Sequence, residues 1–137
     1  MQTSTLINME LYEAIYVSTL APGRPISSVA DIVRKARIAN LRQEITGLLI
    51  FDGMRFCQQL EGMKKQVLGL MEKIRLDPRH INVKIVHHGE LANRRFNGFR
   101  LGYTSAVDPE LLERLENLQG LAAVSAFVAL LSQVDSV

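Results

Sequence analysis

Gln58 has a side-chain amide in the middle of an otherwise apolar strand pattern. Because side chains alternate across a strand, Phe56, Gln58 and Leu60 share one face, which we expect to be the core face. An amide buried there without a partner costs on the order of 1–3 kcal/mol, so a polar group must meet it. An amide donates and accepts hydrogen bonds at once, which makes a bound ligand one candidate for that partner.

Two further polar residues fall in predicted elements where a plain apolar core has no use for them. Tyr16 lies in a predicted strand, and Asn40 lies at the end of a predicted helix. If the inner faces of two strands converge with that helix end, all three side chains line one cleft between two helices. Other interpretations stay open: a core tyrosine with its hydroxyl at the surface, an asparagine that caps the helix in a left-handed conformation, and a glutamine bonded to a neighbouring side chain.

The elements that position these side chains are predicted from hydrophobic spacing and from breaks at glycine and proline. Ser28 and Asp31 resemble a capping box, and Asp52 and Gly53 are expected to form a two-residue hairpin turn. The element order predicts an α+β fold, a ferredoxin-like β-α-β-β-α-β-β sandwich with two additional C-terminal helices. Strands are expected at about 11–18, 45–51, 54–60, 82–88 and 96–103, and helices at about 28–40, 67–74, 109–118 and 121–133.

The predicted sandwich leaves one face of its sheet bare, because both early helices lie on the other face. We expect residues 1–105 to form the ligand-binding domain and 106–137 to be a helical extension that packs on the sheet or on a partner. An apolar stripe in the last helix favours closure of the bare face over a subunit interface. The stripe consists of Leu121, Val124, Phe127, Val128 and Leu131.

Composition indicates one globular domain. The chain has 137 residues, of which 47% are hydrophobic, and a formal net charge of +2. Mixed charges without a basic stripe argue against nucleic acid as a partner. Cys57 is the single cysteine, which excludes an internal disulfide and a cysteine-based metal site and suits a reducing cytoplasm. With neither a signal peptide nor a run of about 20 apolar residues, we expect a soluble cytoplasmic protein without a membrane segment.

Several short segments of the chain combine into a family likeness. They are Ile15–Ser18 with Tyr16, Asn40–Leu49, Asp52–Gly53, Arg55–Gly62, Asp77–His80 and Arg94–Phe96. The Asn-x4-Ile-Thr-Gly, Gln-x-Leu-Glu-Gly and Asp-x-Arg-His elements are specific in this order and spacing. Together they resemble the BLUF (blue light using flavin) photoreceptor domain over about residues 10–105.

The resemblance implies that the chain binds FAD non-covalently, with the isoalloxazine ring between the two helices and the adenine end near the surface. By that likeness Asn40 and Gln58 hold the polar edge of the ring, while Asp77, Arg79 and His80 match the ribityl and phosphate side. A solvated charged loop is the alternative for these last three residues. The apolar walls are expected from Ile32, Leu49, Phe56 and Ile74. Such a groove suits a flat ring with polar groups along one rim.

The resemblance also implies a photochemical role for two residues. In the family, blue light drives an electron and then a proton from the strand-1 tyrosine to the flavin through the strand-3 glutamine, and Tyr16 and Gln58 occupy these positions. The glutamine then keeps a different pattern of hydrogen bonds, which shifts the absorption slightly to the red without net redox turnover. The implied protein is a sensor and not an enzyme.

The output end of the chain departs from the family pattern. Phe99 and Leu101 stand where the family commonly has tryptophan and methionine, and the chain has no tryptophan. Ala39 stands where relatives often carry a polar residue. A phenyl ring cannot make the indole hydrogen bond, so an exchange of tryptophan with methionine near Gln58 cannot be the output route in that form. We expect the signal to leave through the fifth strand with the C-terminal helices, to an unidentified downstream protein or through self-association as a homo-oligomer.

Two other functions fit the same order of elements. A regulatory module that binds a small metabolite and ignores light would use Asn40 and Gln58 to read an amino acid or nucleotide. An acylphosphatase-like hydrolase would need a phosphate loop after the first strand, for which Ala21–Arg24 is only a faint match. Colour separates the three, because only the flavin-bound photoreceptor is yellow and changes its spectrum under blue light.

Overall fold

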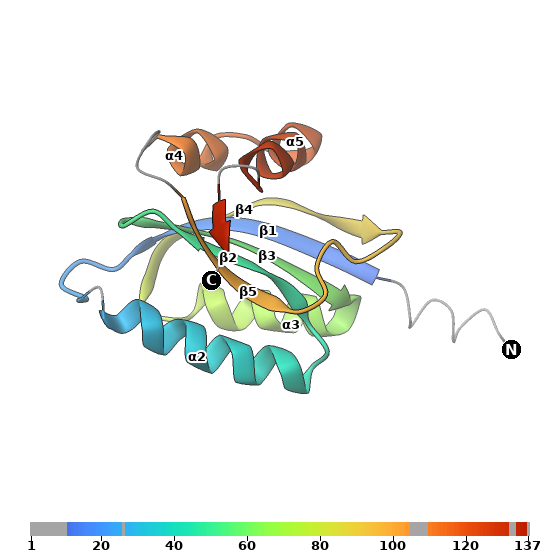
Figure 1. The fold of residues 1–137 in the computed structure, drawn as a ribbon, viewed down its shortest axis with the longest axis horizontal. Coiled ribbons are helices and arrows are strands. Elements are labelled where there is room, and N and C mark those ends of the chain that lie inside the picture. The colour runs from blue at the N-terminus through green and yellow to red at the C-terminus, as the bar shows by residue number, and fades with distance from the viewer. Residues whose placement is uncertain (1–10, 26, 105–109, 132–133, 137) are drawn as a thin grey trace, which may run out of the picture.

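The fold is that of a computed structural model, which describes residues 11–25, 27–104, 110–131 and 134–136. The elements are β1 (Leu11–Leu20), α2 (Ser27–Arg42), β2 (Thr46–Phe51), β3 (Arg55–Met63), α3 (Lys64–Arg75), β4 (His80–Leu91), β5 (Phe99–Thr104), α4 (Leu111–Glu116), α5 (Gly120–Leu131) and β6 (Val134–Ser136). The predicted α+β ferredoxin-like sandwich is confirmed (Figure 1). The short strand β6 was not predicted.

The strands form one sheet in the order β4-β1-β3-β2-β5-β6. The pair β2–β5 is parallel, and the other neighbouring pairs are antiparallel. The two strands that carry Tyr16 and Gln58 are therefore adjacent, near the middle of the sheet. Helices α2 and α3 cover one face of this sheet, and α4 and α5 lie over the other (Figure 1).

Two local predictions were wrong. Because α2 begins at Ser27, Ser28 already lies in its first turn, and its hydroxyl donates to the backbone oxygen of Pro25 at 2.6 Å instead of forming a capping box. The hairpin register pairs Phe51 with Phe56, so the tip of the turn falls at Gly53 and Met54, one residue later than predicted. Asp52 stabilises this turn, because its carboxylate accepts the backbone N–H of Met54 at 2.9 Å.

The face that the sandwich leaves bare is covered by α4 and α5. Their buried residues join sheet residues in one apolar cluster, which contains Ile15, Val17, Leu48, Ile50, Cys57, Val86, Leu112, Leu115, Ala123, Phe127 and Leu130. The predicted stripe on α5 is correct only in part: Phe127 is fully buried and Val124 and Leu131 pack against the cluster, but Leu121 is 82% exposed and Val128 46% exposed. The helix buries Ala123, Phe127 and Leu130 instead, which recur at helical spacing.

Strand β3 is consequently buried on both faces and not on one. Cys57 belongs to the cluster under α4 and α5, and burial raises the pKa of its thiol far above the usual range. Within the part of the chain that the structure describes, no helix combines the length and the apolar character that crossing a bilayer demands.

The opposite face of the sheet has two separate apolar clusters. One lies under α3 and includes Tyr16, Leu60 and Val67. The other lies under α2 and includes Ile32, Leu49 and Phe56. Asn40 and Gln58 are buried but belong to neither cluster. A polar seam therefore runs between the two helices, where the sequence predicts a cleft.

Candidate functional site

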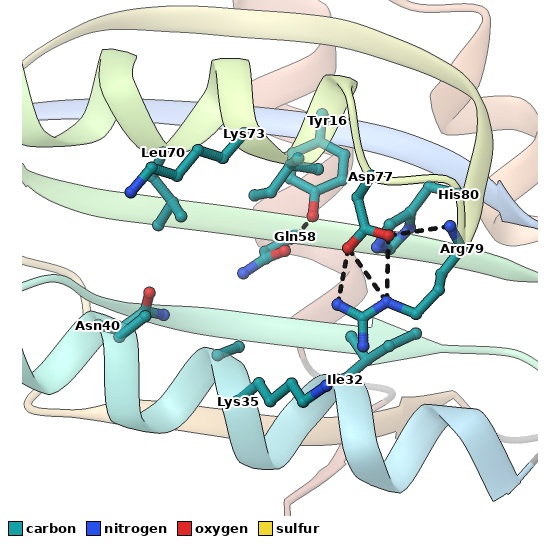
Figure 2. A pocket seen from close by; sticks show the side chains of 13 residues that line it. Tyr16, Ile32, Lys35, Asn40, Gln58, Leu70, Lys73, Asp77, Arg79 and His80 are labelled. Atoms are coloured by element: carbon teal, nitrogen blue, oxygen red, sulfur yellow. Dashed lines mark hydrogen bonds and ion pairs between the residues drawn. The ribbon is translucent and has the colours of Figure 1, made fainter.

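A cavity of about 160 Å³ opens between α2 and α3 above the middle of the sheet (Figure 2). Whole small-molecule pockets usually measure about 300–1,000 Å³, so a ligand much larger than one ring system must extend beyond this cavity. Its lining residues are Tyr16, Ile32, Lys35, Ala36, Ala39, Asn40, Gln58, Leu70, Lys73, Ile74, Asp77, Arg79 and His80. The structure thus brings the three polar residues of the predicted cleft together.

Asn40 enters the cavity from the buried side of α2. It continues the line of Val29 and Val33 at helical spacing on that side and is 1% exposed. Both polar atoms of its side chain, Nδ2 and Oδ1, are buried without a hydrogen-bond partner among the described residues. The helix-cap alternative was wrong, since Asn40 lies inside α2 and the left-handed backbone after this helix is at Glu44, with a φ of 55°. A buried amide with both groups unpaired costs stability unless a ligand meets it.

Tyr16 and Gln58 form a pair across two neighbouring strands. The β1–β3 register places them opposite each other, and the phenol hydroxyl of Tyr16 donates to Oε1 of Gln58. Figure 2 shows the amide nitrogen of Gln58 pointing away from Tyr16 into the space between the helices. The neighbouring side chain therefore satisfies only the carbonyl half of the amide, and the donor half stays available to a ligand.

Burial keeps the Tyr16 phenol neutral. The side chain is 1% exposed, and its desolvation raises the pKa well above the usual value, with a smaller push in the same direction from nearby Cys57 and Asp77. The hydroxyl proton is therefore held on Tyr16 throughout the physiological pH range. It lies on the hydrogen bond to Gln58, so any transfer of this proton begins toward that amide.

Asp77 and Arg79 form a forked ion pair at the mouth of the cavity. Nη2 of Arg79 lies 2.7 Å from Oδ2 of Asp77, and Nε lies 3.1 Å from both carboxylate oxygens. Burial alone raises the pKa of Asp77, but the hydrogen bonds and the charge of Arg79 outweigh it and hold that pKa below its usual value. The pair is fixed in place, because the backbone N–H of Arg79 also donates to Asp77 at 2.9 Å.

His80 lies deeper than the charged pair. Its Nδ1 is 3.0 Å from the hydroxyl oxygen of Ser18, and its ring packs edge-on against Phe56 at 4.8 Å between centroids. Burial lowers the pKa of His80, although the charge of Asp77 acts in the opposite direction. The imidazole is therefore neutral at pH 7, and the solvated-loop alternative does not describe it.

The predicted apolar walls divide into two groups. Ile32 and Ile74 line the cavity, from α2 and from α3. Leu49 and Phe56 do not line it and lie in the core cluster below α2. On the β5 backbone, Leu101 pairs with Leu49 and Phe99 pairs with Gly47, but their side chains fall outside the described part of the structure.

Two charged cavity residues were not predicted, Lys35 on α2 and Lys73 on α3. Both were within reach of helical spacing, since Lys35 comes three residues after Ile32 and Lys73 three residues after Leu70. Lysines are common on exposed helix surfaces, which hides this signal. With Arg79 they place positive charge around the cavity, suited to an anionic part of a ligand. Ala21–Arg24, the faint phosphate-loop match, does not line the cavity.

The arrangement suits a flat heterocycle with donor and acceptor groups along one rim and a negatively charged tail. The unpaired amide of Asn40 and the free donor of Gln58 can meet such a rim, while Ile32 and Ile74 line the cavity and can contact the faces of the ring. Among the described residues, no three metal-ligating side chains gather closely enough to hold a metal ion.

Comparison with known proteins gives concordant results. The family model described as sensors of blue-light using FAD, BLUF, matches residues 11–102. The blue light- and temperature-regulated antirepressor BluF of Escherichia coli is 36% identical over 69 residues, which are 50% of this chain and 17% of that protein. The chain therefore spans less than a fifth of the length of this curated relative.

Solved structures of similar proteins cover more of the chain. BlrB, a BLUF protein in its dark state, matches with a TM-score of 0.76 and 28% identity over 91% of this chain and 97% of that chain. BlrP1 of Klebsiella pneumoniae with FMN and cyclic diGMP matches with a TM-score of 0.68 and 31% identity, over 87% of this chain and 36% of that chain.

Proposed function

Because the chain belongs to the BLUF family, a flavin-binding domain that senses blue light, we propose that it binds FAD between α2 and α3 and signals by rearranging the hydrogen bonds of Tyr16, Gln58 and the flavin. The domain is a sensor and not a catalyst. The proposal rests on one observation above others: the amide of Asn40 is buried in the cavity with neither its donor nor its acceptor satisfied.

In this proposal, different residues of the cavity bind different parts of the flavin. Asn40 offers one donor and one acceptor, as adjacent imide and carbonyl groups on the ring rim require, and Gln58 offers its amide N–H. Ile32 and Ile74, which line the cavity, would contact the ring faces. Leu49 and Phe56 support the floor from below, so they shape the site without forming its walls. Residues 1–105 are the flavin-binding unit in this account.

When bound, the flavin supplies the absorption of blue light and a ring that accepts an electron. Tyr16 would supply one electron, and its hydroxyl proton would leave along the hydrogen bond to Oε1 of Gln58. Both return to Tyr16, so no net oxidation results. The hydrogen-bond partner of the Gln58 amide is a neutral phenol, and a neutral partner lets the amide adopt a second orientation or tautomer at small cost. That second pattern is the signal.

The charged residues determine which flavin binds. Lys35, Lys73 and Arg79 line the cavity and can pair with the pyrophosphate of FAD, while Asp77 holds Arg79 in position and neutral His80 would face the ribityl chain. The isoalloxazine ring alone would fill a cavity of this size. The adenine end of FAD would therefore lie outside the cavity, near the surface. Riboflavin has no phosphate and cannot use these contacts.

Titration of the apoprotein with FAD, FMN and riboflavin tests this proposal. FAD should bind more tightly than riboflavin, and the double variant Lys35→Ala with Lys73→Ala should weaken FAD binding roughly two- to thirtyfold while leaving riboflavin unchanged. Lys65→Ala, at an exposed position of α3 outside the cavity, is the matched control. Equal affinity of the wild type for all three flavins would contradict an FAD site.

The signal must reach another molecule, which we propose to be an unidentified downstream protein or a second copy of this chain. The relative BluF is an antirepressor, as its name states, and so acts on another regulator. In this account 106–137 is the extension that transmits the signal. Cys57 is a free buried thiol, which agrees with action in the reducing cytoplasm. Sedimentation in darkness and under blue light distinguishes these two possibilities, since only self-association changes the mass of the pure protein.

A further inference from the structure

The strand that holds Gln58 has a second polar cluster on its opposite face. Glu13, on β1, is 2% exposed, and Gln59 and Glu61, on β3, are both 0% exposed. Two carboxylates buried this completely are strongly unfavourable unless hydrogen bonds and a positive charge compensate them. The cavity lining does not include these residues, so their burial needs a different explanation.

The compensation comes from the segment between β4 and β5. Glu61 accepts the backbone N–H of Arg95 at 2.9 Å with Oε1 and that of Phe96 at 3.0 Å with Oε2. The guanidinium of Arg95 donates to both oxygens of Glu13, at 2.9 Å from Nε and 3.2 Å from Nη2. We call Glu13, Gln59, Glu61 and Arg95 the carboxylate clamp. It fastens the main chain just before β5 to the middle of the sheet.

Gln59 fixes the clamp to β3 in one orientation. Its amide nitrogen donates to Oε1 of Glu13 at 3.1 Å and to Oε1 of Glu61 at 3.0 Å. Reversing the amide would place its oxygen against two carboxylates, so the observed orientation is favoured. In this orientation Oε1 of Gln59 is buried without a partner among the described residues. Gln58, one residue earlier, has a neutral phenol as its protein partner. Adjacent residues of one strand thus hold a locked amide and a switchable one.

The clamp leads directly into β5. Arg94 adds bonds on the outside, because its guanidinium donates to the hydroxyl of Thr46 at 2.8 Å and to the backbone oxygen of Glu44 at 3.0 Å. The backbone N–H of Gly47 donates to the oxygen of Gly98 at 3.1 Å, one residue before β5 begins. Any movement of β3 relative to this segment therefore changes the entry of β5.

We propose that the carboxylate clamp couples the flavin site to β5: the altered bonding of Gln58 displaces β3, and this releases the backbone of Arg95 and Phe96 from Glu61. The inference rests on the proposed photochemistry of Gln58. It assigns Glu61 and Arg95 as positioning residues of the output, which act through β3 without touching the flavin. The coupled element is the segment 92–98, with one clamped and one released arrangement.

Hydrogen–deuterium exchange of the full chain, loaded with flavin, in darkness and under continuous blue light tests this coupling. Peptides covering 92–98 should exchange faster in the light in the wild type. Glu61→Gln should keep the light-induced red shift but exchange fast at 92–98 in both conditions, so that the light-dependent difference disappears. Glu72→Gln, an exposed carboxylate of α3 paired with Arg75, is the matched control and should behave as the wild type.

A second variant protects the test against misfolding of the first. Arg95→Ala removes the guanidinium from Glu13 but leaves the Arg95 backbone N–H to Glu61, and it should reduce the light-dependent difference without abolishing the red shift. An unchanged difference in both variants, or a wild type that shifts its spectrum with no exchange change at 92–98, would overturn the coupling. Loss of the red shift in the wild type would instead count against the proposed function.

Discussion

At the scale of single residues, the polar side chains of the cavity differ in whether they have a hydrogen-bond partner within the protein. Tyr16 and Gln58 bond each other, Asp77 and Arg79 bond each other, and the amide of Asn40 bonds no described residue. Native proteins rarely leave a buried amide with both groups unpaired, which marks Asn40 as the position most specific for a ligand. Its placement could be predicted from the sequence, since it continues the buried side of a predicted helix.

Replacing Asn40 should have opposite effects on the two forms of the protein. Asn40→Leu removes an unpaired buried amide, so the apoprotein should be as stable as the wild type or more stable by about 1 kcal/mol in urea unfolding. The same variant should bind flavin about tenfold or more weakly, measured by quenching of flavin fluorescence. Gln119→Leu, at an exposed position, is the control. Unchanged flavin affinity would exclude Asn40 from the site.

Tyr16 should be dispensable for binding but not for the light response. Tyr16→Phe keeps the ring in the core and removes only the hydroxyl that donates to Gln58. The variant should remain yellow, with flavin affinity within about threefold of the wild type, and should lose the light-induced red shift. Difference absorption spectroscopy measures both. A normal shift in Tyr16→Phe would refute its role as the donor.

At the scale of elements, local spacing was enough to predict the helices and the five longer strands, whereas the contacts of the carboxylate clamp between distant residues were missed. The clamp could not be predicted, since Glu13 and Arg95 are 82 residues apart. The error on α5 has the same origin. An apolar helix offers several stripes, and only its packing against the sheet decides that Phe127 faces inward while Leu121 does not.

The clamp gives β1 a stability contribution that depends on pH. Burial raises the pKa of Glu13, but hydrogen bonds from Arg95 and Gln59 and the charges of Arg95 and His87 outweigh it, so the folded pKa lies below the usual value of 4.5. The unfolded chain then binds more protons than the folded one in this range. The contribution is therefore complete above about pH 4.5 and is lost as the pH falls through the folded pKa.

Urea unfolding between pH 7 and pH 3 measures this contribution. Glu13→Gln should be less stable than the wild type at pH 7, and the difference should shrink as the pH falls below about 4.5. Glu72→Gln, an exposed carboxylate of α3, serves as the comparison. A difference between Glu13→Gln and the wild type that is constant down to pH 3 would show that Glu13 contributes no ionised carboxylate to the fold.

At the scale of the whole molecule, the described sheet is covered on both faces, by α2 and α3 over the cavity side and by α4 and α5 over the other (Figure 1). The covered back face contains Cys57 and the α5 residue Phe127 in one cluster. Changes at the flavin site and at α5 are thus separated by a single layer of strands. The extension after β5 is placed to respond to the sheet, whichever partner receives the signal.

The packing of α5 can be measured with two variants of one helix. Phe127→Ala should destabilise the protein by about 3–5 kcal/mol, because it leaves a cavity in a fully buried cluster. Leu121→Ala, where the side chain is 82% exposed, should change the free energy of unfolding by no more than about 0.5 kcal/mol. Equally small effects of both would show that α5 is not held on the sheet.

The absorption spectrum of the pure protein, recorded in darkness, after blue light and again in darkness, tests the central claim most directly. We expect a yellow protein whose oxidised flavin bands move slightly to the red on illumination and return in the dark, because the rim contacts of the ring change and its redox state does not. A well-folded protein that binds no flavin, or one whose flavin spectrum stays the same under blue light, would contradict this account.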